Sequence, residues 1–363
     1  MAYTIDDGVR GWPGRALIRW VAAVTLAAFL AGCAIGQRGP FKLPSGALPP
    51  AKVPPAAARA PARLERSAPF AIAAGPDGNM WFTEFHTSRI GRITPQGDLT
   101  AFKVSAARLP ERLTAGPDGA IWFTDPAGNQ IGRLTTDGAA VAVPIPTPHS
   151  GPAGITLGPD GNLWFTEHSA NFIGRITPLG TITEFALPGG GGPAGIAAAD
   201  GNLYFAENQG NRIVRMSPQG RLDEFPLTHP GSVPNDIAAA PNGDLWFTEI
   251  GTDRVGRLTP DGRITEYALP VHGVPFGIAL GRAGDVWVTI AKEHAICRIR
   301  ADGRVSAFYL PVDIDPSLIA AGPDGNLWFT EPDGNIGRFD PSGVLKQFKV
   351  AQPAQPMADA ASD

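Results

Sequence analysis

One phrase of about forty residues recurs seven times between residues 68 and 350, and no other feature constrains the fold as strongly. Its idealised form is P-x-G-I-x-x-G-P-D-G-N-L-W-F-T-E, a loop, and then I-G-R-I-T-P-x-G-x-I-T-E-F-x-L-P. One aromatic column marks the units at spacings of 41, 42, 40, 42, 41 and 41 residues: Trp81, Trp122, Trp164, Tyr204, Trp246, Trp287 and Trp328. A period of this length indicates one supersecondary unit that is stacked against copies of itself.

Each unit contains four short β-prone runs, which we name A to D in chain order. In the third unit they are residues 154–157, 163–167, 173–177 and 181–185, and Asp160-Gly161 forms the turn between the first two. Asp-Gly is typical of tight hairpins, because glycine supplies the positive φ that such turns need. Four antiparallel strands per unit at this period match a propeller blade. The sequence therefore predicts an all-β fold, a seven-bladed β-propeller over residues 67–350.

The seventh unit carries its own fourth run at residues 344–348, which leaves the closure of the ring open. Many propellers complete the last blade with a strand from the N-terminus. Here either the phase of the strands differs from this reading, or the last blade packs on the first through side chains alone.

The N-terminus has the pattern of an export signal. Arg10, Arg15 and Arg19 precede an apolar run at residues 20–30, which is too short to span a bilayer as a stable helix. The run ends in Leu-Ala-Gly-Cys, which resembles the lipobox of bacterial lipoproteins and makes Cys33 the expected lipidation site. We therefore expect residues 1–33 to be a signal peptide and the mature protein to be lipid-anchored, at the outer membrane facing the periplasm.

Composition predicts the remaining segments. Residues 34–66 are rich in proline and alanine and are expected to form an extended tether, and residues 351–363 a disordered tail. With Cys33 acylated, Cys297 has no disulfide partner and is expected to be a packed strand residue. The net charge of −4 and the lack of a basic run exclude a nucleic-acid binder, and we expect a monomer.

An acidic residue ends the B run of six units and an arginine lies in the C run of all seven. The regular spacing predicts cross-strand ion pairs that support blade packing, in preference to a ring of metal ligands. The acids are Glu84, Asp125, Glu167, Glu207, Glu249 and Glu331, and the arginines are Arg92, Arg133, Arg175, Arg215, Arg257, Arg298 and Arg338.

The loops sort onto two faces of the predicted ring. Asp-Gly turns occupy one face almost uniformly, whereas the B–C and D–A connections on the other are irregular and contain all six histidines: His86, His149, His168, His229, His272 and His294. Variable loops are where function concentrates. The residue after the proline that opens each A run should lie near the central axis on this face, and these residues are Phe70, Glu111, Ala153, Ala194, Asn235, Phe276 and Ser317.

The repeated phrases strongly resemble those of the virginiamycin B lyase (streptogramin lyase) family over residues 68 to 350. The resemblance implies ring opening of a cyclic depsipeptide by elimination, with a histidine as general base and Mg²⁺ held by carboxylates. The family's two histidine positions correspond to Phe276 and Ser317 here. One metal position is retained as Asp315, while the other aligns with Pro332, next to Glu331. This sequence therefore departs from the family at three of four positions.

Two functions remain open on this evidence. The first is a propeller without lyase activity, which binds a small molecule, a cell-envelope component or a protein partner through Phe70, Glu111, Asn235, Phe276 and Ser317. The second is a metal-dependent lyase or lactonase for a cyclic ester. In that case Asp315, Glu111 and Glu331 would hold Mg²⁺ or Ca²⁺, and His272 or His294 would replace the lost base.

Overall fold

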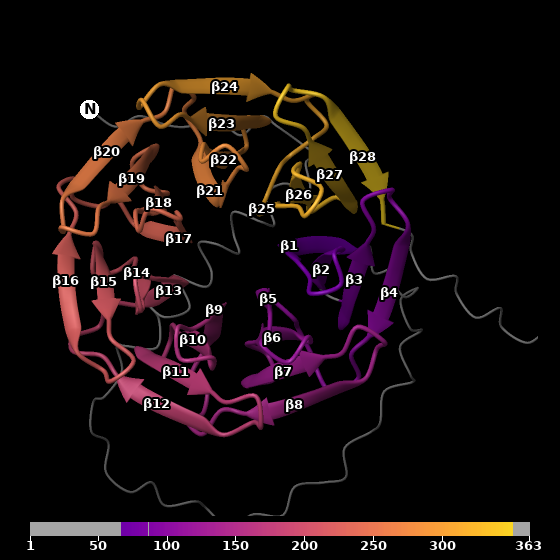
Figure 1. Cartoon of the computed structure of the whole chain (residues 1–363), viewed down its shortest axis with the longest axis vertical. Helices are drawn as coiled ribbons and strands as arrows, with labels where there is room; N and C mark the ends of the chain where they lie inside the picture. The colour runs from indigo at the N-terminus through magenta and orange to yellow at the C-terminus, as the bar shows by residue number, and fades with distance from the viewer. Residues whose placement is uncertain (1–66, 86, 351–363) are drawn as a thin grey trace, which may run out of the picture. The chain divides into compact units, whose positions relative to one another are not determined.

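The computed structural model describes residues 67–85 and 87–350, which lie in one compact unit spanning Leu64–Asp363. This part of the chain forms seven four-stranded antiparallel sheets arranged as blades around a central axis (Figure 1). The predicted seven-bladed propeller is confirmed. No helix that could cross a membrane occurs among these residues. The predicted signal peptide, tether and tail, together with His86, lie outside the described residues.

Blades 1 to 7 follow chain order, and each contributes one strand of every kind. The A strands surround the axis: β1 (Ala68–Ala74), β5 (Leu113–Ala115), β9 (Pro152–Leu157), β13 (Pro193–Ala199), β17 (Pro234–Ala239), β21 (Val274–Leu280) and β25 (Ile319–Ala321). The B strands follow: β2 (Met80–Phe85), β6 (Ile121–Asp125), β10 (Leu163–Glu167), β14 (Asn202–Glu207), β18 (Leu245–Glu249), β22 (Val286–Ala291) and β26 (Leu327–Glu331).

The two outer positions repeat in the same way. The C strands are β3 (Arg89–Ile93), β7 (Gln130–Leu134), β11 (Phe172–Ile176), β15 (Arg212–Met216), β19 (Arg254–Leu258), β23 (Ala295–Ile299) and β27 (Asn335–Phe339). The D strands are β4 (Leu99–Lys103), β8 (Ala140–Pro144), β12 (Ile182–Ala186), β16 (Leu222–Pro226), β20 (Ile264–Ala268), β24 (Val305–Tyr309) and β28 (Leu345–Lys349).

The core lies between blades, and the B strands are buried on both faces. Trp81 of blade 1 packs with Leu113 and Phe123 of blade 2, and all three side chains are buried. Equivalent clusters join the other neighbouring blades. Because each blade buries a face against the next, the blades depend on one another for their hydrophobic stabilisation.

The glycine of the I-G-R phrase makes room for the phenylalanine of W-F-T-E. A Cβ on Gly91 of β3 would lie 2.1 Å from Cζ of Phe82 in β2, and four other blades repeat this contact. In blade 6 Val288 replaces the phenylalanine and Cys297 replaces the glycine, so the smaller valine leaves room for the larger cysteine. Cys297 is fully buried in β23, as predicted, and its burial raises the pKa of the thiol to about 12.

Blade 7 closes the ring on blade 1 without exchanging a strand. All four strands of the last sheet come from the seventh repeat. Trp328 packs with Ile72 and Phe82 of blade 1, and the Thr330 hydroxyl donates a hydrogen bond of 2.6 Å to the carbonyl of Phe70. Side chains therefore form the closing seam, which answers the question that the sequence left open.

Cross-strand ion pairs between a B-strand acid and a C-strand arginine form in blades 1 and 4, as Glu84–Arg89 and Glu207–Arg212, but the predicted pairing of the acids with the Arg92 column is wrong. The register places Arg92 opposite Trp81 and Glu84 opposite Arg89, so Glu84 and Arg92 lie at opposite ends of the hairpin. The Arg92 guanidinium lies over the Trp81 ring and pairs with Asp77 of the A–B turn at 3.5 Å. The B-strand acid and the arginine of the Arg92 column therefore have different partners, and their spacing of seven or eight residues does not correspond to a contact.

The glycine contact gives a first prediction. Gly91→Ala should lower the free energy of unfolding by about 1–3 kcal/mol, because the added methyl overlaps the Phe82 ring. Gly190→Ala is the matched control, since a Cβ there meets no atom within 4 Å. Urea denaturation followed by tryptophan fluorescence measures both, and equal midpoints for the two variants would contradict the packing argument.

Candidate binding site

A threonine in the B strand fixes the residue that faces the axis. The Oγ1 atom of Thr83 accepts the N–H of Ala71 at 3.0 Å and donates to the carbonyl of Glu111 in the next blade at 2.9 Å. Equivalent bonds to the next blade's carbonyl come from Thr124, Thr166, Thr248, Thr289 and Thr330. The residues that follow the opening prolines thus form one ring around the axis, which we call the axial ring: Phe70, Glu111, Ala153, Ala194, Asn235, Phe276 and Ser317.

One arc of the axial ring is aromatic. The rings of Phe70 and Phe276 meet edge to face with centroids 6.3 Å apart, although they belong to blades 1 and 6. Phe85, at the end of β2, lies 5.6 Å from Phe70. Ser317 of the intervening blade is buried and small, which allows the two phenylalanines to meet. This arc offers a ligand an apolar surface.

The opposite arc is polar and has unused hydrogen-bonding capacity. His168 and Asn208 are buried residues that directly follow a B-strand acid, and both side chains approach Gly192. The Nδ1 atom of His168 lies 3.3 Å from the carbonyl of Pro193, while its Nε2 atom has no partner. Asn208 Oδ1 and Asn235 Nδ2 are also buried without a partner, as is Ser317 Oγ within the aromatic arc. Buried polar atoms in native proteins are normally satisfied by protein, water or ligand.

The polar residues that follow the acids were not among the predicted ligand contacts. The available signal was the position that follows the acid, or Ile290 in blade 6, since it varies as much as the axial ring does: Phe85, Pro126, His168, Asn208, Ile250, Ala291 and Pro332.

An ion pair spans the axis one residue beyond the ring. Arg112 of blade 2 and Asp236 of blade 5 approach to 3.1 Å, and Asp236 Oδ2 also accepts the N–H of Ile278 at 3.2 Å. The two blades are not neighbours, so the pair links opposite sides of the propeller. Both side chains are largely shielded from solvent, which strengthens the attraction relative to an exposed pair.

Glu111 brings an ionisable group to the axial ring. Burial raises the pKa of its carboxyl to about 7, and the positive charge of Arg112 opposes that shift only partly. The charge that Glu111 presents to the ring therefore changes near neutral pH.

The B-strand acids anchor the loops that enter the blades. Asp125 shows this most fully, because its carboxylate accepts the N–H groups of Arg108 and Leu109 at 2.9 Å and of Gly128 at 3.0 Å. Glu84 similarly accepts the hydroxyl of Ser67 at 2.9 Å. These carboxylates have a structural role, because they bind the connections that form the irregular face.

Blade 3 contains an acid that has lost its partner. The residue opposite the acid is Arg89, Gln130, Arg212, Arg254 or Asn335 in five blades, but Glu167 faces Phe172. Neither carboxyl oxygen of Glu167 has a hydrogen-bond partner. Burial raises its pKa to about 8; the nearby Ser150 hydroxyl opposes this shift and the charge of Glu184 adds to it. The folded state therefore favours the protonated carboxyl.

Asp315 and Glu331, two of the residues predicted to hold a metal, already form hydrogen bonds within the protein. Asp315 Oδ1 accepts the N–H of Lys292 at 3.0 Å, and Glu331 Oε2 accepts the amide of Gln347 at 2.7 Å. Burial raises the pKa of Glu331 to about 7, with the nearby charges of Asp333 and Asp313 adding to the shift. Within residues 67–85 and 87–350, no three His, Cys, Asp or Glu side chains are grouped as a cation site.

The two candidate replacement bases lie in separate loops. The Nδ1 atom of His294 is 2.9 Å from the carbonyl of Ile314. His272 is exposed, and its Nδ1 atom lies 3.2 Å from Asp253. The structure thus assembles the predicted axial ring but brings neither histidine together with Asp315 and Glu331 as a metal-assisted active site.

A closed seven-bladed propeller with an irregular axial ring defines the structural class of this protein. The model of the virginiamycin B lyase family matches residues 56–192 and 190–362, and the chain belongs to that family. Membership defines the repeat type and the fold, while activity depends on the residues of the site.

Solved structures of lyases share this architecture. A streptogramin B lyase is 34% identical with a TM-score of 0.72, over 78% of this chain and 94% of that one. A catalytically inactive histidine-to-alanine variant of virginiamycin B lyase from Staphylococcus aureus, with quinupristin, is 34% identical with a TM-score of 0.72, over 76% and 95% of the chains. No curated protein sequence matches the chain significantly.

The unpaired acid of blade 3 gives a prediction about pH. The carboxyl binds a proton more tightly in the folded state, so its favourable contribution to stability is complete below pH 4.5 and is lost as the pH rises to about 8. Glu167→Gln cannot ionise and should stabilise the protein at pH 8 by about 2–4 kcal/mol, with little effect at pH 4.

The matched variant is Glu84→Gln, which removes one partner of the Arg89 ion pair and should destabilise the protein at pH 8. Thermal unfolding of both variants at pH 4, 6 and 8 measures the difference. The same pH response in Glu167→Gln and the unsubstituted protein would show that Glu167 is ionised in the fold.

Proposed function

We propose that this protein is a ligand-binding propeller that uses its axial ring and lacks streptogramin lyase activity. The observation that carries the proposal is the group of buried, unpartnered polar atoms on His168, Asn208, Asn235 and Ser317. His168 and Asn208 belong to blades 3 and 4, across the ring from the aromatic arc of Phe70 and Phe276, whereas Asn235 is next to Phe276 in the ring and Ser317 lies within the arc. An apolar surface with a few convergent polar groups is the usual composition of a small-molecule site.

The side chains at the family's base positions argue against elimination. Phe276 has no group that can accept a proton, and the Ser317 hydroxyl is not basic enough to abstract one from carbon. Phe276 is moreover packed against Phe70, so it has a structural role in the aromatic arc. Loss of a general base typically slows a reaction by about 10²–10⁴-fold.

The residues present do not fit the Mg²⁺ site that the family implies. Asp315 already accepts a backbone N–H, Glu331 accepts a hydrogen bond from Gln347, and Pro332 has no side-chain ligand atom. A cation that bound with useful affinity would need several carboxylate or carbonyl oxygens arranged around one point. We therefore assign no catalytic step to a metal.

The export pattern supports a location for this function. Lipidation at Cys33 would fix the propeller to the outer membrane in the periplasm, with residues 34–66 as its tether. In that compartment the ligand would be a small molecule, a cell-envelope component or a surface of another protein. The absence of a basic run argues against nucleic acid.

A direct assay tests the catalytic part of the proposal. The purified full chain, with quinupristin and excess Mg²⁺, should open the ring at a rate at least about 10²-fold below that of the Staphylococcus aureus lyase under the same conditions. Comparable turnover would overturn the proposal.

Metal binding can be measured separately by thermal unfolding with EDTA and then with Mg²⁺, Ca²⁺ or Mn²⁺. We expect no shift of the midpoint, because a ligand raises it only by binding the folded state. A rise that Asp315→Ala abolishes would favour the metal-dependent lyase or lactonase instead.

The binding part of the proposal is tested with soluble peptidoglycan fragments as the probe, by isothermal titration. Asn208→Ala and Asn235→Ala should each weaken binding by about tenfold, since each removes a buried hydrogen-bonding group. Leu179→Ala is the control, because Leu179 is exposed in a C–D turn on the other face. Binding that neither asparagine variant weakens would exclude the axial ring as its site.

A further inference from the structure

The repeat pairs its C-strand arginine with a carboxylate from the A–B turn in six blades. In blades 1, 2, 3 and 7 the acid lies four residues before the tryptophan, and in blades 5 and 6 it lies two residues before it. The pairs are Asp77–Arg92, Asp118–Arg133, Asp160–Arg175, Asp244–Arg257, Asp285–Arg298 and Asp324–Arg338. A turn carboxylate next to the C-strand guanidinium is therefore a regular feature of the blades.

Blade 4 departs from this rule. Tyr204 replaces the tryptophan, and Asn202 occupies the position two residues before it, where Asp244 and Asp285 hold their arginines. The Asn202 amide instead donates to the carbonyl of Asp200 at 3.0 Å. Asp200 stands four residues before Tyr204, as the acids of blades 1, 2, 3 and 7 stand before their tryptophans, but its carboxylate makes no ion pair with Arg215 among the described residues. The guanidinium of blade 4 therefore lacks the turn carboxylate that contacts it in the other six blades.

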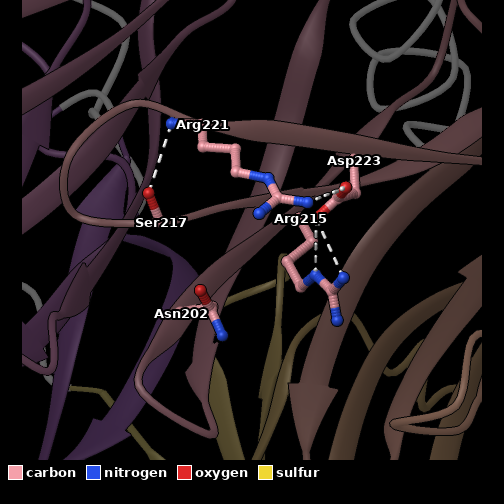
Figure 2. A pocket seen from close by; sticks show the side chains of 5 residues that line it. All are labelled: Asn202, Arg215, Ser217, Arg221 and Asp223. Atoms are coloured by element: carbon pink, nitrogen blue, oxygen red, sulfur yellow. Dashed lines mark hydrogen bonds and ion pairs between the residues drawn. The ribbon is translucent and has the colours of Figure 1, made fainter.

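A surface pocket of about 210 Å³ lies at this place, lined by Asn202, Arg215, Ser217, Arg221 and Asp223 (Figure 2). The guanidinium groups of Arg215 and Arg221 both contact the carboxylate of Asp223. Arg215 donates to Asp223 Oδ2 from Nε at 3.1 Å and from Nη2 at 2.9 Å, while Arg221 Nη2 lies 3.7 Å from Oδ1. Two arginines against one aspartate leave one positive charge in excess.

We propose that this pocket binds an oxyanion, the carboxylate, phosphate or sulfate group of a small molecule, in the place that the turn aspartate takes in the other blades. Guanidinium groups favour such ligands because their planar donors match two oxygens at once. The Ser217 hydroxyl accepts the N–H of Arg221 at 3.2 Å and can donate its own hydrogen to the anion. The pocket belongs to the Asp-Gly face, so this inference is independent of the axial ring.

The experiment uses the full chain and three probes: sodium phosphate, sodium sulfate and sodium acetate, each titrated at constant ionic strength against sodium chloride. Thermal unfolding should show a saturable rise of the midpoint with at least one anion, because binding to the folded state stabilises it. A response to the tetrahedral anions alone assigns a phosphate or sulfate ligand, and a response to acetate alone assigns a carboxylate.

A single substitution should fill the pocket from within. Asn202→Asp places a carboxylate where Asp244 and Asp285 lie, and the anion-dependent shift should disappear while the fold is preserved. Asn162→Asp is the matched control, since it adds the same charge in blade 3, where Asp160 already contacts Arg175. That variant should keep the full shift.

A substitution that removes a carboxylate from the pocket, instead of adding one, tests the proposal independently. Asp223→Thr installs the residue found at this position in blades 1, 3 and 5, which is Thr100, Thr183 and Thr265, and removes the competing carboxylate. The half-saturating anion concentration should fall about tenfold. The absence of a saturable shift with all three anions, or a shift that Asn202→Asp leaves intact, would overturn the proposal.

Discussion

The burial of one blade's face against the next is the interaction on which the structure depends. The B strands are buried on both sides, and the aromatic residue of each lies in a cluster completed by the following blade. Area of this kind is removed from water only when two blades meet, so a single repeat has little hydrophobic stabilisation of its own. The B-strand threonines add a hydrogen bond between neighbours at six of the seven seams, next to the axis. Packing and hydrogen bonding together fix the spacing of the axial ring.

Much of this fold could be predicted because each repeat encodes its own sheet. The tryptophan column gave the number of blades, and the turn residues gave the antiparallel pairing. The error concerned Arg92, because spacing along the chain does not reveal register. The hairpin pairs Trp81 with Arg92 and Glu84 with Arg89, so charges with regular spacing belong to different clusters. A prediction from register, with the B–C loop counted explicitly, would have assigned Arg89 as the partner of Glu84.

The candidate site could be predicted in position but only partly in chemistry. The column after the opening proline located the axial ring, since every blade places that residue alike. The contact of Phe70 with Phe276 and the pair of Arg112 with Asp236 join blades far apart in the chain. Such contacts depend on how seven blades close around one axis, and no single repeat contains that information. The unused hydrogen-bonding atoms of His168 and Asn208 likewise became evident only once their neighbours were known.

The seam between blades 7 and 1 has a consequence for how such a ring can change. It is built from contacts that recur at four of the other seams, a tryptophan packed against a neighbour's phenylalanine and a threonine bonded to a neighbour's carbonyl. No strand is borrowed across it, so the order of the blades has no privileged origin. The chain could begin at any of the D–A connections and still make every interface. A new start point would relocate the termini, and with them any attachment, around the rim without altering a single sheet.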